Sequence, residues 1–201
     1  MNPMDVSRAL EQLNEIHHQL GRSEIYRGYR SKTLALTGGV GMAASAFLAL
    51  AWKDAALVER AGFWVAVAAL NLAIASWEIL GDYGELKTEH QRRITKQTVG
   101  QFLPTLCSGF LLTIVFVAKE ANLQLLPGVW AVMFSLGIFA SRPYLPRGVG
   151  WVGAYFLATG ALLLGVCENA LSQAWYMGVV FGGGQLLLAY VMYQNLEREK
   201  L

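Results

Sequence analysis

The chain has 201 residues and a formal net charge of +2, and 55% of its residues are hydrophobic against 15% that are charged. A net charge this small gives no electrostatic footprint for a nucleic-acid partner. The positions from which charged residues are absent are more informative, because long apolar stretches are typical of membrane proteins.

Six windows of about twenty residues are almost free of charged residues, and Glu78 is the one exception inside them. Each window has the ~20 residues that a helix needs to cross a hydrocarbon core of ~30 Å. The sequence therefore predicts an all-α membrane protein, with a six-span transmembrane domain over 33–193 and a short tail over 194–201. The predicted spans are 33–52, 61–80, 99–118, 123–141, 148–167 and 174–193.

Residues 4–20 are predicted to form an amphipathic helix ahead of the first span. Leu10 and Leu13 belong to an apolar stripe at helical spacing, and the opposite face is not basic. A helix that grips anionic lipid normally carries Lys or Arg on its polar face. We therefore expect this helix to self-associate or to dock on cytoplasmic loops, with a position on the membrane surface as the alternative.

An aromatic and basic segment, which includes Tyr26, Arg27 and Arg30, leads into the first span. Such residues at a cytoplasmic interface are typical of a topology anchor. The alternative is a patch that binds an anionic headgroup or a phosphorylated ligand. Residues 1–32 are thus predicted to be a cytoplasmic segment that combines the helix with this anchor.

Two polar amides, Asn71 and Gln185, are predicted to lie near the middle of the membrane. An amide in hydrocarbon needs a partner, and hydrogen bonds between helices contribute about 0.6–2 kcal/mol. We expect both to hold helices together. The alternative is a polar path for a solute, which Thr113, Ser135 and Thr159 would extend.

Glu78 lies two residues from the inner end of the second span. Ionisable groups within a membrane are costly and need a reason. A carboxylate this close to the interface is expected to reach water or to pair with Arg27, Arg30 or Lys96. A proton or cation site is the alternative.

Small residues recur in three spans. Stripes of Gly41, Ser45 and Ala49 and of Gly150, Ala154 and Ala158 predict close helix packing in the first and fifth spans. The triple glycine centred on Gly183 interrupts the sixth span. It predicts either close packing or a hinge beside a binding site.

The basic residues alternate across the predicted membrane. Thirteen of the sixteen Lys and Arg residues fall on one set of segments and three on the other. By the positive-inside rule, both termini are predicted to be cytoplasmic. The richer segments are 1–32, 81–98, 142–147 and 194–201, and 81–98 is expected to be a loop with a helical second half.

The six tryptophans all fall near predicted span ends, where they are expected to form interfacial belts. The first two outer turns share Lys, an acid, Leu, Gly and Trp at identical spacing, and the third carries a shortened echo of this pattern. The pattern predicts three copies of a two-helix unit. The alternative is that the pattern arose by chance, because acidic residues are common in outer turns and Trp is common in interfacial belts. The matching residues are Leu57, Gly62 and Trp64, then Leu123, Gly128 and Trp130, then Leu171 and Trp175.

Motifs of known enzymes are missing. The sequence has no His-Glu-x-x-His, Cys-x-x-Cys or Gly-x-Ser-x-Gly pattern, and His17, His18 and His90 all fall on predicted cytoplasmic segments. We therefore expect no enzymatic activity, no catalytic residue, no cofactor and no metal.

These observations favour a non-enzymatic membrane anchor or regulatory subunit that acts through its cytoplasmic face. Its partners would be the lipid bilayer and either a cytoplasmic protein or another copy of the chain, in a homo-oligomer. The alternative is a small-solute transporter or channel with a polar path near Asn71 and Gln185. Short outer loops favour a bacterial cytoplasmic (inner) membrane.

Overall fold

The computed structural model describes residues 31–85, 89–119, 122–146, 148–166, 169 and 171–197. The expected N-terminal helix with Leu10 and Leu13, and the segment with Tyr26, Arg27 and Arg30, lie outside the described residues.

Every regular element in the described part of the chain is helical. Five helical stretches are long and apolar enough to cross a membrane, by length and composition, and the sixth apolar helix is shorter, at 17 residues. The elements are α2 (Ser31–Ala51), α3 (Leu57–Glu85), α4 (Glu89–Ala118), η1 (Leu123–Leu125), α5 (Leu126–Ser141), η2 (Arg142–Tyr144), α6 (Val149–Gly165), α7 (Ala174–Met177), η3 (Gly178–Gly183), α8 (Gly184–Met192) and η4 (Tyr193–Glu197).

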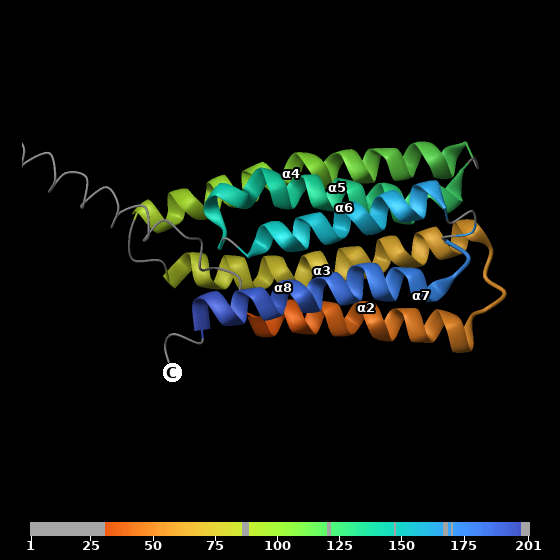
Figure 1. Cartoon of the computed structure of the whole chain (residues 1–201), viewed down its shortest axis with the longest axis horizontal. Helices are drawn as coiled ribbons and strands as arrows, with labels where there is room; N and C mark the ends of the chain where they lie inside the picture. Colours follow the sequence, from red (N-terminus) through yellow and green to blue (C-terminus); the bar gives the residue numbers. More distant parts are fainter. Residues whose placement is uncertain are drawn as a thin grey trace, which may run out of the picture.

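The helices form two layers (Figure 1). Helices α4, α5 and α6 lie together, with α5 between the other two, while α2 lies against α3 and against the rod formed by α7, η3 and α8. The first and last described helices are therefore neighbours, and contacts between α6 and α8 join the layers. The proximal end of the bundle is the end where α2 begins, and the distal end is where α2 stops.

Segment 81–98 is predicted to be a loop with a helical second half. The structure shows that most of its first half is helical too, which corrects that part of the prediction. Helix α3 continues through Gly81 to Glu85, and α4 begins at Glu89. A glycine inside a helix costs only about 1 kcal/mol relative to alanine, which does not stop a helix that has no proline nearby. The predicted span 61–80 covers the apolar part of α3 and omits the polar residues with which the helix continues to Glu85.

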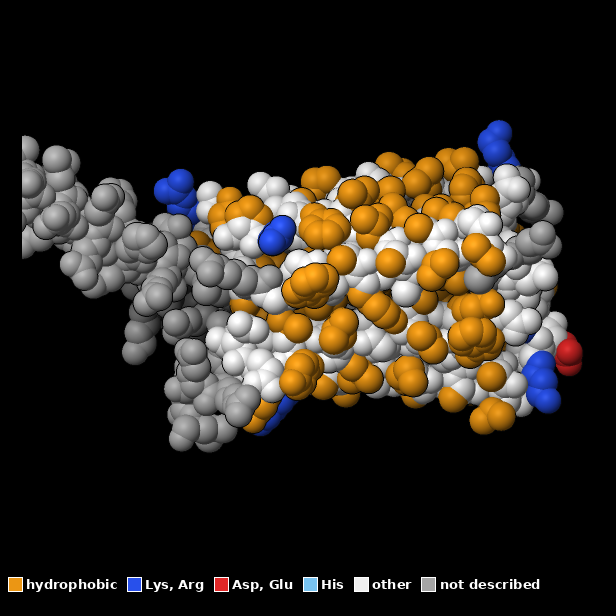
Figure 2. Space-filling view, viewed as in Figure 1, with side chains coloured by type: hydrophobic (Ala, Val, Ile, Leu, Met, Phe, Trp, Pro, Cys, Tyr) orange, Lys and Arg blue, Asp and Glu red, His pale blue; other side chains and the backbone are white. Residues whose placement is uncertain are grey.

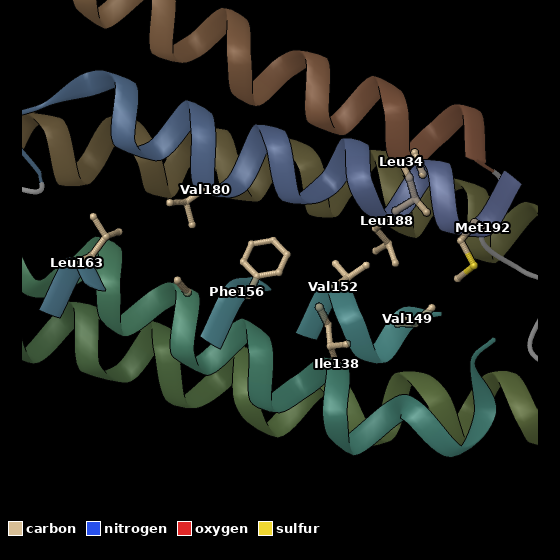
Figure 3. Packing of buried hydrophobic residues seen from close by; sticks show 11 residues of the cluster. Leu34, Ile138, Val149, Val152, Phe156, Leu163, Val180, Leu188 and Met192 are labelled. Atoms are coloured by element: carbon tan, nitrogen blue, oxygen red, sulfur yellow. The ribbon is translucent and has the colours of Figure 1, made fainter. Parts of the chain in front are cut away.

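One hydrophobic cluster fills the space between the two layers (Figure 3). Phe156 of α6 is fully buried at its centre. Its ring centroid lies 4.9 Å from that of Phe134 on α5 and 5.6 Å from that of Phe181 in η3. Aromatic pairs at these centroid distances are favourable beyond their buried area when the rings are not stacked squarely face to face, and both pairs here are tilted. These three rings therefore connect α5 and α6 to the rod formed by α7, η3 and α8, which we call the last rod.

A second cluster closes the distal end, and it corrects one belt prediction. Trp64 is only 3% exposed and packs there with Leu123 and Leu171. It is therefore a core residue, because its large ring fills the space where the distal turns meet. Trp77 and Trp151, by contrast, are 84% and 80% exposed near the proximal end, as an interfacial belt requires.

The outer surface of the bundle is apolar over its whole length. Figure 2 shows hydrophobic side chains across the visible face, with Lys and Arg toward its two ends. Helices α3 and α4 are the least covered, since only 6% and 11% of their apolar windows are buried within the structure. Exposed apolar surface this extensive is what a lipid bilayer covers. The described fold is thus that of a multi-pass integral membrane protein.

Candidate functional site

The most polar part of the bundle follows one face of α2. Thr33, Thr37, Gly41 and Ser45 recur at a spacing of four residues. At 3.6 residues per turn they form a single line that drifts slowly around the helix. We call these residues the α2 stripe. Its first half faces polar side chains of α3 and α8, and its second half faces small residues of the last rod.

The proximal half of the α2 stripe holds Glu78. The Thr33 hydroxyl donates a hydrogen bond of 2.7 Å to Glu78 Oε1 on α3. This bond places the carboxyl group in the seam between α2 and α3. Of its predicted cationic partners, Arg27 and Arg30 lie outside the described residues, and Lys96 lines a groove between α3 and α4. Glu78 is thus engaged by a threonine that the sequence analysis did not single out.

One turn further along α2, Thr37 connects both amides. Asn71 Nδ2 donates to the Thr37 carbonyl oxygen at 3.4 Å, and the Thr37 hydroxyl lies 3.5 Å from Gln185 Oε1. That hydroxyl also lies 3.0 Å from the Leu34 carbonyl oxygen. Because a hydroxyl has one hydrogen, it donates to one of these acceptors at a time. The structure therefore brings Asn71 and Gln185 to one buried threonine.

Asn71 is not fully satisfied by these contacts. Its Oδ1 atom is buried and accepts no hydrogen bond within the described residues. A buried acceptor left without a donor costs about 1–3 kcal/mol. The contacts between the described helices do not account for this atom.

The distal half of the α2 stripe is a close-packed seam. A Cβ added at Gly41 would lie 3.4 Å from the Gly182 Cα, and one added at Gly178 would lie 2.5 Å from Ser45 Oγ. The Ser45 hydroxyl donates to the Ala174 carbonyl oxygen at 2.8 Å. Small residues that let two backbones approach are the usual basis of helix association in membranes.

The triple glycine belongs to the same packing. A Cβ at Gly182 would meet Met42 at 2.8 Å, and one at Gly184 would meet the Phe156 ring at 2.3 Å. Gly183, by contrast, faces Tyr155, whose hydroxyl oxygen would lie 3.4 Å from the added Cβ. Three consecutive glycines thus serve three different neighbours, which favours the packing interpretation over a hinge.

The first two of these glycines end a π-helical segment, η3, and the third begins α8. The Tyr155 hydroxyl of α6 donates to the Val179 carbonyl oxygen at 2.7 Å. A π-helix departs from the i→i−4 pattern and so leaves a carbonyl for an outside donor. Nothing in the sequence pattern indicated this contact.

The hydroxyls that were expected to extend a polar path lie elsewhere. Thr113 donates to Gly109 and accepts from the Trp130 ring nitrogen at 2.8 Å. Ser135 donates to the Gly153 carbonyl, and Thr159 to that of Tyr155. Each belongs to the layer of α4, α5 and α6, and none contacts the α2 stripe.

At the distal end, Arg60 forms a clamp that the sequence analysis missed. It is only 6% exposed, and its guanidinium donates to the carbonyl oxygens of Ala55 (3.0 Å), Ser172 (2.9 Å) and Lys53. Gln124 grips the same turn, since its Oε1 accepts from the Leu171 amide at 2.9 Å. Together these side chains tie the turn before α7 to the turns before α3 and α5.

The described residues contain no group of three or more His, Cys, Asp or Glu that could hold a metal ion. No protein-family model, no curated protein and no solved structure matches the chain. The candidate site is the α2 stripe with Asn71, Glu78 and Gln185, whose described contacts are hydrogen bonds between helices.

Removing the Thr33 hydroxyl tests the proximal contact. Thr33→Val is expected to lower the free energy of unfolding by about 1.5–3 kcal/mol, the usual contribution of a hydrogen bond to a charged group. Thr33→Ser, which keeps the hydroxyl, is the control. In a Glu78→Leu background the same Thr33→Val change should cost little more, because the two residues act as a pair. Equal losses in both backgrounds would show that the hydrogen bond contributes nothing.

Proposed function

We propose that this chain is a non-enzymatic membrane anchor or regulatory subunit whose working surface is its cytoplasmic face. The observation that carries the proposal is the use of polar side chains inside the bundle. Thr33 binds Glu78, and Thr37 contacts both Asn71 and Gln185. Polar groups that satisfy one another between helices hold a bundle together and leave little for a solute to bind.

The close contacts beside these groups support the same function. Gly41, Gly178 and Gly182 let α2 and the last rod approach until an added Cβ would touch the neighbouring helix. A seam this tight leaves no room for a water-filled path along it. The membrane domain then serves to hold and orient the segments outside the bilayer.

We propose six spans, with both termini in the cytoplasm of a bacterial cell and the protein in its cytoplasmic membrane. Helix α6 would be the short span, since its 17 residues reach about 25 Å and lie at the lower limit for crossing. The distribution of Lys and Arg supports the orientation. The proximal end would then face the cytoplasm.

The repeat of three two-helix units also remains a proposal. Its support is that Leu57, Leu123 and Leu171, the matching leucines of the three distal turns, all pack on the distal cluster. Equivalent positions in three hairpins thus meet at one place. Duplicated hairpins related by an axis along the membrane normal would bring them together in this way.

The partner would be a soluble cytoplasmic protein or a second copy of the chain, bound through residues 1–32. The apolar stripe of the predicted N-terminal helix supports this assignment, because its polar face lacks the basic residues of a lipid-binding helix. An amphipathic helix that does not rest on lipid needs another apolar surface to cover it.

Changes to the two faces of that helix test the proposal. Leu10→Ser with Leu13→Ser is expected to abolish oligomer formation or recovery of the bound protein, while the chain still inserts into the membrane. Glu11→Ser with Glu15→Ser alters the polar face of the same helix and is the matched control. Light scattering of the purified protein and the stoichiometry of co-purified chains are the readouts. Unchanged assembly in the leucine variant would contradict the proposal.

A second function, transport of a small uncharged solute, is favoured by one observation. The Asn71 Oδ1 atom is buried and accepts no hydrogen bond from the described residues. A solute or water that donates there would satisfy it. Transport predicts that Asn71→Leu and Gln185→Leu each cut uptake of glycerol into proteoliposomes, whereas the anchor function predicts no change.

A further inference from the structure

An open groove of about 380 Å³ lies between α3 and α4 near the proximal end. The two helices are consecutive in the chain yet belong to different layers of the bundle (Figure 1). The residues that line the groove are Ile79, Leu80, Thr95, Lys96, Val99 and Gly100. Its volume falls within the ~300–1,000 Å³ of sites that hold small molecules.

The wall of the groove suits a hydrocarbon chain. Leu80 is 71% exposed and Val99 is 37% exposed, so both offer apolar surface to whatever fills the groove. Gly100 is exposed too, and a Cβ added there would meet no atom within 4 Å. The two helices are largely exposed, since only 6% and 11% of their apolar windows are buried within the structure. In a membrane, an acyl chain of a lipid is the apolar group that reaches such a position.

Positive charge lies at the proximal side of the groove. Lys96 lines the groove, and Arg93 lies about one turn before Lys96 on α4. Both side chains are exposed, and neither makes an ion pair or hydrogen bond with the described residues. Glu78 on α3 accepts a hydrogen bond from Thr33 on α2. The groove therefore combines an apolar wall with basic side chains at one end.

We propose that this groove binds one anionic phospholipid. Its acyl chain would lie against Leu80, Val99 and Gly100, and its phosphate would contact Lys96 and Arg93. Basic pockets between membrane helices on the cytoplasmic side are typical sites for anionic headgroups. The groove shares no residue with segment 1–32, so its test is independent of the test of the proposed partner surface.

Competition between two lipids that differ only in their headgroups tests whether the groove prefers an anionic headgroup. Native mass spectrometry of the purified full-length chain is expected to show one phosphatidylglycerol retained in preference to phosphatidylcholine. Lys96→Gln should weaken this retention about fivefold, which corresponds to ~1 kcal/mol for one basic residue near a membrane surface. Lys119→Gln, directly after the distal end of α4, should leave retention unchanged. Equal retention of both lipids would overturn the proposal.

A larger side chain in the groove tests whether an acyl chain of the lipid occupies it. Gly100→Leu should displace the bound lipid, since the new side chain enters open space and meets no neighbour. Gly39→Leu, at another exposed glycine with open space around it, is the matched control. Soluble glycerol 3-phosphate should not compete, because it lacks the chain. Retention that survives both Gly100→Leu and Lys96→Gln would place the lipid elsewhere and overturn the proposal, as would effective competition by glycerol 3-phosphate.

Discussion

Gly184→Ala is expected to lower the free energy of unfolding by about 1–3 kcal/mol, the usual cost of an overpacked core. The added methyl carbon would lie 2.3 Å from Phe156 Cζ. Phe156 cannot move aside easily, because it is fully buried and its ring packs against Phe134 and Phe181. The strain must therefore separate α6 from α8, which are the elements that join the two layers. Reversible unfolding in mixed detergent micelles, followed by circular dichroism, measures the loss.

The control for this prediction is Gly39→Ala on the exposed face of α2. Nothing lies within 4 Å of a Cβ at that position. Alanine favours a helix over glycine by up to about 1 kcal/mol, so this variant should be neutral or slightly more stable. If the two variants unfold alike, the close approach of α6 and α8 at Gly184 is wrong.

Arg60→Met is expected to cost at least about 3 kcal/mol, because it leaves three carbonyl oxygens without their charged donor. Those oxygens belong to Ala55, Ser172 and Lys53, in the turns before α3 and α7. Hydrogen exchange at the amides of 171–173 should also accelerate, since the turn loses one of its two anchors. The remaining anchor is Gln124.

Arg60→Lys and Lys53→Met distinguish a clamp from a simple charge effect. Lysine keeps the charge but lacks the planar fork that reaches several carbonyls, so it should recover only part of the stability. Lys53 is exposed and contributes only its backbone carbonyl, so Lys53→Met should be nearly neutral. Full recovery by Arg60→Lys would contradict the clamp.

The positions of the helices followed from the sequence because the thickness of the bilayer dictates the length of an apolar helix. Helix ends were less predictable. The window ending at residue 80 stops five residues before α3 does. Hydropathy reports contact with hydrocarbon, whereas the backbone continues its hydrogen bonds into the polar layer.

The site was only half predictable, for a related reason. Asn71, Glu78 and Gln185 stand out because polar groups are rare in apolar windows. Thr33 and Thr37, which contact all three, are common membrane residues, and their role depends on α8 packing beside α2, far away in the sequence. The spacing of four that links them to Gly41 and Ser45 was the one available signal. Arg60 similarly resembles an ordinary loop charge until the distal turns meet around it.

The central claim is that the bundle is closed around Asn71 and Gln185, and thiol labelling tests it most directly. Cysteine would be placed at 71 or 185 in a chain whose Cys107 and Cys167 are serine, and proteoliposomes would be treated with a charged maleimide. Leu111→Cys on the exposed apolar surface is the unlabelled reference, and Lys53→Cys in a distal turn is the labelled one. We expect positions 71 and 185 to stay as unreactive as 111. Labelling of either at the rate of position 53 would reveal a hydrated path and contradict the anchor function.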